Sequence, residues 1–378
     1  MTYLQKSNRK SKKTLIVSVI VVVTVIVVGW LGLRYYVFHF LGAGKRATVT
    51  ITASTSQNDN ETPTQIPATV LLLTDYYVSQ TFNNCASSAL SMDFSFFGVS
   101  ASQQQISDDV RPDNNLTGKG DDKSTFPDQL VQEAEKYGLI AYFRPNGNID
   151  LLKQFIANGI PVITKTLLNT SENYAHYRVI KGYDDTTGII TDEDGFQGPN
   201  IQFSYNDFMT LWKAFGYEYV VVASPNQQSL IEKILGGNLD EKTAWTGAVQ
   251  TAKAALAQNP NDNEAGLNLS VAEYYTGDYQ GSIDEYQKIA PELSKYALWY
   301  QIEPIESYLA LGDYSQVFSL TNNILNSGNQ AFPELYVLQG DAYEKEGDIS
   351  QAKQAFEQAL IYNKNLQSAQ NDLSTLSS

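Results

Sequence analysis

One cysteine and one histidine are the side chains of this chain best suited to nucleophilic chemistry. Cys85 is the only cysteine among 378 residues, and Gln80 precedes it by five residues. The apolar spacing that follows predicts a helix from Asn84 to Phe97, with the thiol at its start. The positive end of a helix dipole lowers the pKa of a thiol and favours the thiolate, which is the nucleophilic form.

His176 is the candidate general base for this thiol, because a neutral imidazole near pH 7 suits proton transfer. It opens a predicted strand at Tyr177–Lys181, and Asp192 and Asp194 follow after a turn at Gly182–Gly188. Two adjacent antiparallel strands would bring one of these carboxylates beside the ring, and alternation puts both on one face. A small buried cysteine and a structural histidine are the alternative interpretation of the same residues.

The chain from about residue 66 to 224 resembles the papain-like cysteine peptidases related to bacteriocin leader processing, the double-glycine peptidases and their stand-alone relatives. By that resemblance Cys85 is the nucleophile, His176 the base and Gln80 the oxyanion donor. The residues that carry the resemblance are Gln80-x-x-x-x-Cys85 with Leu90 and Met92, then His176-Tyr177-Arg178-Val179-Ile180-x-Gly182-Tyr183-Asp184.

The residue that orients the imidazole has two candidates. An ungapped count from His176 gives Asp192. Asp194 lies four residues before Gly198-Pro199-Asn200, as the orienting Asp does in the stand-alone relatives, and we favour it. Ala86 departs from the family, which usually has Gly directly after the cysteine. Its methyl group would crowd the substrate backbone, so a catalytically inactive relative is the alternative.

An uncharged aliphatic run near the N-terminus predicts a single membrane span. Thr14 to Leu33 is long enough to cross about 30 Å of hydrocarbon as a helix, and we assign the span to residues 14–37. Five basic residues precede the aliphatic run and three follow it before residue 47, so residues 1–13 are predicted to be a cytoplasmic tail and the part after the span extracytoplasmic. A cleaved signal peptide is the alternative.

The remaining chain divides by composition into a linker and two domains. Residues 38–66 are predicted to form a polar linker. Residues 67–225 are predicted to form an α+β domain, which the resemblance implies is papain-like. The helices expected there are Asn84–Phe97, Phe126–Tyr137 and Ile149–Asn158, and the strands are Val70–Leu73, Pro161–Thr166, Tyr177–Lys181, Ile189–Thr191 and Tyr217–Val222.

Residues 226–378 predict an all-α domain of tetratricopeptide (TPR) repeats. Gly-Asp steps at Gly277, Gly312 and Gly347 recur every 35 residues, which fits a helix–turn–helix repeat of about 34 residues. We expect three to four repeats. The concave face of such a stack usually binds a peptide or protein, although the array can also serve only to stabilise its neighbour.

Charge and composition exclude several kinds of partner. Residues 1–46 contain eight basic and no acidic residues, so residues 47–378 hold 18 Lys and Arg against 41 Asp and Glu. A body this acidic repels nucleic acid. One cysteine and two histidines cannot build a structural zinc site, and Asp192–Gly195 lacks the other ligands of a calcium loop. We therefore expect no metal and no cofactor.

The sequence thus predicts a bacterial, single-pass membrane protein whose extracytoplasmic part is a cysteine peptidase. It would cleave peptide or related amide bonds by a Cys-His-Asp mechanism, while the TPR repeats bind a substrate or partner protein. The alternative is a catalytically inactive, membrane-tethered binding scaffold.

Overall fold

The computed structural model describes residues 66–112 and 125–377, which belong to one compact unit. The predicted cytoplasmic tail (1–13), membrane span (14–37) and nearly all of the linker (38–66) lie outside the described residues and remain predictions. In the described stretches, no helix is both long enough and apolar enough to cross a bilayer.

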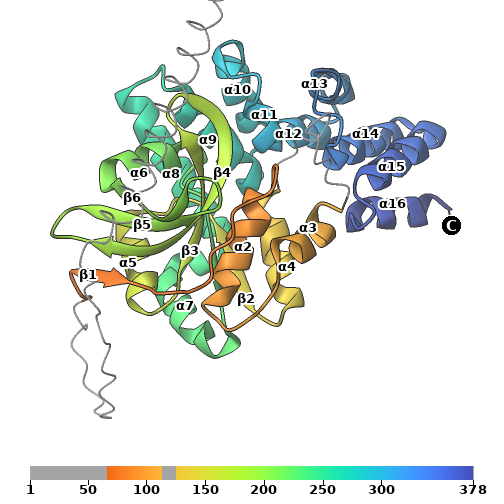
Figure 1. The fold of residues 1–378 in the computed structure, drawn as a ribbon. Helices are drawn as coiled ribbons and strands as arrows, with labels where there is room; N and C mark the ends of the chain where they lie inside the picture. The colour runs from red at the N-terminus through yellow and green to blue at the C-terminus, as the bar shows by residue number, and fades with distance from the viewer. Residues whose placement is uncertain (1–65, 113–124, 378) are drawn as a thin grey trace, which may run out of the picture. The chain divides into compact units, whose positions relative to one another are not determined.

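An antiparallel sheet occupies the centre of the first described domain (Figure 1). The strands lie in the order β2-β7-β3-β4-β5-β6, and β1 pairs with the C-terminal end of β4. Their bounds are β1 Thr69–Leu71, β2 Ile140–Arg144, β3 Val162–Asn169, β4 Glu172–Asp184, β5 Ile189–Asp194, β6 Gly198–Ser204 and β7 Tyr219–Ala223.

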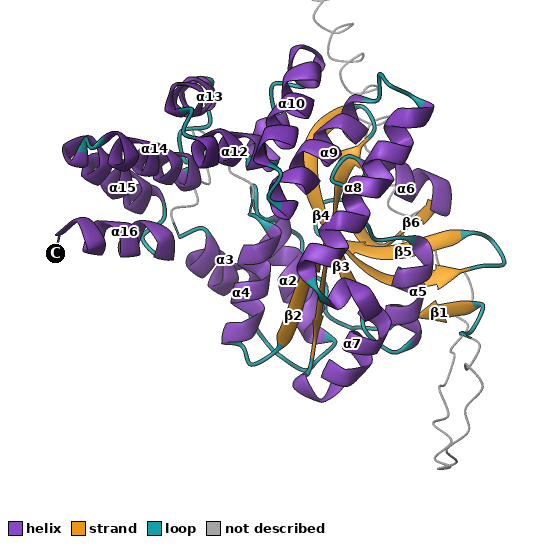
Figure 2. Cartoon of the chain, turned by 180° about the vertical axis from the view of Figure 1, so that it is seen from behind, coloured by secondary structure: helices purple, strands orange, loops and turns teal. Residues whose placement is uncertain are grey.

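Helices cover both faces of this sheet (Figure 2). Val162, Ile180 and Val221 belong to one buried cluster with α5, α6 and α7, whereas their sequence neighbours on the same strands belong to a second cluster with α2 and α4. This is the period-two alternation of a sheet buried on both sides. The helices are α2 Cys85–Ser95, α3 Gln103–Val110, α4 Pro127–Lys136, α5 Ile149–Ala157, α6 Tyr205–Lys213 and α7 Gln228–Leu235.

The mixed fold, an antiparallel sheet with helices followed by a helical region, agrees with the predicted α+β class at this coarse level. Each helix and strand predicted in the sheet domain has a counterpart within a few residues. The sequence analysis missed α3, α6, β2 and β6. β2 is short and gives a weak pattern. β6 begins with Gly198-Pro199-Asn200, which is typical of a turn because Gly and Pro are depleted in strands.

The helical region consists of paired helices that turn at the predicted Gly-Asp steps. At the last step Gly347 has φ +84°, which favours glycine, and the Asp348 side chain accepts a hydrogen bond from the Gln351 N–H to cap the next helix. The helices are α8 Glu241–Gln258, α9 Asn263–Thr276, α10 Tyr279–Ile289, α11 Ala297–Tyr300, α12 Glu303–Leu311, α13 Tyr314–Asn326, α14 Pro333–Glu346, α15 Ile349–Tyr362 and α16 Gln367–Ser377.

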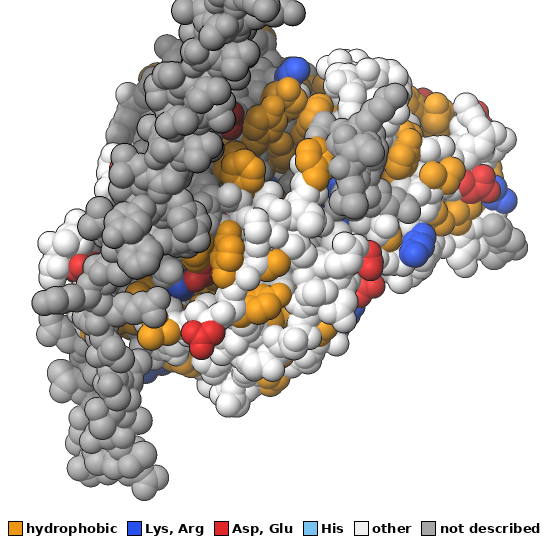
Figure 3. Space-filling model, viewed as in Figure 1, with side chains coloured by type: hydrophobic (Ala, Val, Ile, Leu, Met, Phe, Trp, Pro, Cys, Tyr) orange, Lys and Arg blue, Asp and Glu red, His pale blue; other side chains and the backbone are white. Residues whose placement is uncertain are grey.

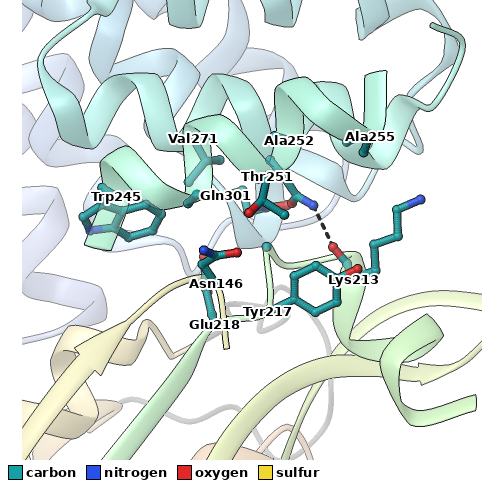
Figure 4. Close-up of a pocket in the computed structure, with 14 residues that line it drawn as sticks. Asn146, Lys213, Tyr217, Glu218, Trp245, Thr251, Ala252, Ala255, Val271 and Gln301 are labelled. Atoms are coloured by element: carbon teal, nitrogen blue, oxygen red, sulfur yellow. Dashed lines mark hydrogen bonds between the residues drawn. The ribbon is translucent and has the colours of Figure 1, made fainter. Parts of the chain in front are cut away.

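The first helices of this region share a core with the sheet domain. Trp245 of α8 stacks on Tyr275 of α9 with ring centroids 3.9 Å apart, and both rings meet Phe143 of β2 edge-on. Beside this contact lies a small cavity of about 50 Å³, bordered by Asn146, Tyr217 and the α8 side chains (Figure 4). The sheet domain and α8–α9 are therefore joined by buried packing.

Candidate active site

Cys85 is the first residue of α2, as the sequence predicts. The turn before it is fixed by Asn84, whose Nδ2 donates to Thr81 Oγ1 at 2.7 Å and whose Oδ1 accepts from Ser107 Oγ at 3.1 Å. From Ala86 to Phe94 every residue of α2 is buried, so the helix lies in the domain interior. Its N-terminus presents the partly exposed thiol to a cleft.

His176 of β4 connects the thiol to a carboxylate at the end of β5. Its Nε2 lies 2.8 Å from Asp194 Oδ1, which leaves Nδ1 as the ring nitrogen for the hydrogen bond with Cys85. The same Asp194 oxygen accepts the backbone N–H groups of Phe196 at 2.7 Å and Gln197 at 2.8 Å. The two backbone N–H donors fix the position of the Asp194 carboxylate, and the carboxylate fixes the orientation of the His176 ring.

The electrostatics of this group favour an ion pair between thiolate and imidazolium. Burial raises the pKa of Cys85, but the hydrogen bond and charge of His176, the Tyr177 N–H and the charge of Arg111 lower it below its ordinary value. Burial lowers the pKa of His176, but Asp194 and Cys85 raise it above its ordinary value. The proton therefore moves toward the histidine, as a nucleophilic cysteine requires.

Asp194, and not Asp192, contacts the imidazole. Both carboxyl groups lie on the same face, and Arg178 Nε is 3.3 Å from Asp192 Oδ2 and 3.2 Å from Asp194 Oδ2. Arg178 is anchored by donating to the carbonyls of Leu167 at 2.9 Å and Leu168 at 2.8 Å. Arg178 belongs to the sequence motif around His176, but no role is predicted for it from the sequence, because its contacts depend on how β4 pairs with β3 and β5.

The two carboxyl groups have opposite pKa shifts. Burial and the charge of Asp194 together raise the pKa of Asp192 to about 8, despite the attraction of Arg178. Burial also acts on Asp194, but His176, Arg178 and the Gln197 N–H lower its pKa below the ordinary value. At neutral pH Asp194 is therefore the ionised member of the pair, and Asp192 carries a proton.

Gln80 lies in the same cleft, locked to the segment that follows Asp194. Its N–H donates to the Gly195 carbonyl at 2.8 Å. A Cβ on Gly195 would clash with Ser88 Oγ of α2, so only glycine allows this close approach. The glycine thereby sets the distance between the helix that carries Cys85 and the strand that carries Asp194.

Ala86, which departs from the family pattern, is 3% exposed. It packs in the core beneath α2 and also borders the cleft. The Ala86 methyl group is therefore almost completely buried by packing in the core.

The cleft above Cys85 and His176 has a volume of about 580 Å³ and an aromatic lining. Phe82, Tyr174 and Phe196 border it and are exposed. The remaining wall comes from the helical region, at Tyr296, Trp299 and Tyr300. The sequence analysis missed this wall, since no local pattern links the α11 segment to a cysteine far earlier in the chain.

The α11 segment is fixed to the sheet domain. Lys165 of β3 donates from Nζ to the Tyr300 carbonyl at 2.9 Å, and the Tyr174 and Tyr296 rings lie 5.3 Å apart. Within the described stretches, no group of His, Cys, Asp and Glu side chains is arranged to hold a metal ion. The arrangement can thus supply a nucleophile, a base and an orienting carboxylate beside an aromatic cleft.

Comparison with known families gives one match for this part of the chain. Residues 56–220 match the Peptidase_C39 like family. The match covers the sheet domain, called the C39-like domain below, and confirms the resemblance stated from the sequence. None of the curated proteins compared with the chain matches it.

Three of the solved structures similar to the chain are a C39-like peptidase, a double glycine motif protease and a TPR protein. A putative C39-like peptidase from Bacillus anthracis is 17% identical, with 41% of this chain and 98% of that chain covered and a TM-score of 0.35. A double glycine motif protease from an AMS/PCAT transporter, in complex with the leader peptide, is 18% identical, with 39% and 91% covered and a TM-score of 0.30. A thermophilic TPR protein of Thermus thermophilus is 21% identical, with 38% and 77% covered and a TM-score of 0.31. The similarity of this domain to the C39-like family rests on the family match, since all three TM-scores are below 0.5.

Proposed function

We propose that this protein is a membrane-anchored, extracytoplasmic cysteine peptidase that cleaves peptide or related amide bonds. The observation that carries the proposal is the contact chain from Cys85 through His176 to Asp194, in which the pKa of the thiol is lowered and that of the imidazole is raised. The match to the C39-like family supports the same reaction class.

In the proposed reaction the Cys85 sulfur attacks the carbonyl carbon and the carbonyl electron pair moves to oxygen. Gln80 and the backbone N–H at the start of α2 stabilise that oxyanion. His176 gives its proton to the leaving nitrogen as the C–N bond breaks, which leaves a thioester. Water then attacks the thioester while His176 takes a proton from it, and the acid product and free thiol are restored.

The aromatic cleft supports a preference for substrates with a large apolar side chain near the scissile bond. Phe82, Tyr174 and Phe196 are exposed beside the nucleophile, and Trp299 completes the wall from the helical region. Burying one such side chain of the substrate against these rings contributes about 1.5–3 kcal/mol. The helical repeats would thus take part in substrate selection as well as binding a protein partner.

The membrane anchor at residues 14–37 is part of this proposal. It rests on the aliphatic composition of that segment and the basic residues that precede it. A tethered peptidase acts only on substrates near the bilayer. Protease protection of the C39-like domain in intact cells would contradict the extracytoplasmic placement, whereas its digestion by added protease is the expected result.

The alternative is an inactive scaffold in which the helical repeats bind the partner, and Ala86 motivates it. A mixed peptide library separates the two possibilities. Wild-type protein should produce new peptide termini, and Cys85→Ala should produce none. Asp194→Asn should cleave far more slowly, whereas the neighbouring Asp192→Asn serves as the matched control and should cleave nearly as wild type does. Absence of cleavage by all forms would favour the scaffold.

A further inference from the structure

A second cleft, of about 500 Å³, lies where the C39-like domain meets the helical region. α4, β3 and the start of β7 contribute to it from one side, and α9, α12, α14 and α16 from the other. Seven carboxyl groups line it: Asp128, Glu218, Glu241, Glu303, Glu306, Glu334 and Asp341. On the face shown in Figure 3, by contrast, the acidic side chains are scattered among neutral ones.

Lys165 is the one cationic side chain among the described residues that line this acidic cleft. Its Nζ already donates to the Tyr300 carbonyl at 2.9 Å and lies 3.4 Å from Glu218 Oε2. The charge of Lys165 is therefore paired with that of Glu218. No other cationic side chain of the described residues lines the cleft beside the remaining carboxyl groups.

Glu303 has a buried carboxyl oxygen for which the described residues supply no partner. It is 6% exposed, and its Oε2 has no hydrogen-bond partner among the described residues. Its Oε1 accepts a long hydrogen bond, 3.4 Å, from the Tyr275 hydroxyl. A buried carboxyl oxygen without a partner costs free energy, which a donor entering the cleft would recover.

The carboxyl groups of the cleft raise one another's pKa values. Burial raises the pKa of Glu303 to about 8, with further contributions from Glu306 and Glu218. Burial raises the pKa of Glu306 to about 7, with contributions from Asp128, Glu334 and Asp341 and an opposing hydrogen bond from Tyr274. A bound cation reverses this repulsion, so these groups would release protons when it binds.

We propose that the acidic cleft binds a lysine- or arginine-bearing segment of a peptide. A metal ion is not favoured, because the described carboxyl groups do not converge on a point where one could be held. The acidic cleft adjoins the active-site cleft, since Thr125 and Tyr300 line one while Phe126 and Ile302 line the other. An extended peptide can reach from one cleft to the other. The choice of a peptide as the ligand rests on the proposed function in this respect alone.

Fluorescence anisotropy of the full-length protein tests this inference without requiring catalysis. The probes are two fluorescein-labelled peptides, Gly-Lys-Gly-Lys-Gly and Gly-Glu-Gly-Glu-Gly, at physiological salt. The lysine peptide should bind at least about tenfold more tightly. Glu306→Gln combined with Asp341→Asn should remove that preference. Glu346→Gln combined with Glu357→Gln makes two carboxyl-to-amide changes at exposed positions on α14 and α15, and should change the affinity less than about twofold.

The pH dependence adds a second readout. The affinity for the lysine peptide should rise from pH 6 to pH 8, as Glu306 and Glu303 ionise, with Asp128, Glu218, Glu334, Asp341 and Lys165 facing them. Calorimetry in two buffers of different ionisation enthalpy should detect proton release on binding. Equal affinity for the two peptides, loss of binding in the exposed-position control, or tighter binding of spermidine than of the lysine peptide would overturn the inference. Binding without any cleavage would leave it standing and contradict only the proposed function.

Discussion

The opposite pKa shifts of Asp192 and Asp194 predict opposite outcomes for two nearly isosteric substitutions. Asp192→Asn replaces a carboxyl group that is protonated in the folded protein, because its pKa is raised from 3.8 to about 8. Asp194→Asn replaces a carboxylate that holds the His176 ring. The first change should preserve the site and the second should disable it.

The stability change expected for Asp192→Asn can be estimated from the raised pKa. At pH 7 the unfolded chain ionises Asp192 and the folded chain does not, which costs the wild-type protein about 4 kcal/mol at 1.36 kcal/mol per pH unit. The introduced amide avoids that cost. It enters a position where neither Asp192 oxygen has a hydrogen-bond partner among the described residues, which costs about 1–3 kcal/mol. The variant should therefore be more stable than wild type by about 1–3 kcal/mol at pH 7.

The sign of this effect changes with pH. Because the folded pKa of Asp192 exceeds its unfolded pKa, the wild-type penalty is absent below about pH 3.8 and grows as the pH rises toward 8. Urea unfolding followed by tryptophan fluorescence should show the variant gaining stability between pH 4 and pH 8 relative to wild type. An Asp192→Asn variant that is less stable at pH 7, or as inactive as Asp194→Asn, would refute this assignment of protonation states. Asp194→Asn itself should lose about 10²- to 10⁴-fold in rate.

Three further substitutions test the packing around the site and in the repeats. Gly195→Ala places a methyl in steric conflict with Ser88 Oγ and should slow alkylation of Cys85 at least about tenfold, with partial recovery on adding Ser88→Gly. Gly340→Ala places a methyl in steric conflict with the Phe356 ring and should lower the unfolding free energy by about 1–3 kcal/mol without changing Cys85 reactivity. Trp299→Ala removes part of the cleft wall and should raise KM for peptides with apolar side chains, while the rate of alkylation by iodoacetamide stays unchanged.

The elements that carry the site were predictable because their signals are local. Small and apolar residues after Cys85 indicate a buried helix, and the apolar run after His176 indicates the strand that holds it. Repetition of Gly-Asp steps identifies the helix pairs without any tertiary information. Alternation also placed Asp192 and Asp194 on one face, as found.

The features that escaped prediction depend on distant contacts. The sequence favours Asp194 over Asp192 as the partner of His176, but it does not predict the β-bulges at Lys181 in β4 and Asn200 in β6 that shift the register on both sides of β5. The aromatic wall depends on α11, which ends just before α12 begins and is held by Lys165 on another domain. No sequence pattern within α11 or around Lys165 predicts that these two segments come into contact.

The pH profile of Cys85 alkylation tests the central claim most directly. With iodoacetamide, the wild-type protein should react with a midpoint well below about pH 8.5, because His176 lowers the pKa of the thiol. His176→Ala should raise that midpoint to about 8.5 or above, since burial then acts on the thiol without the imidazole. A wild-type midpoint at or above about 8.5, unchanged in His176→Ala, would contradict the account.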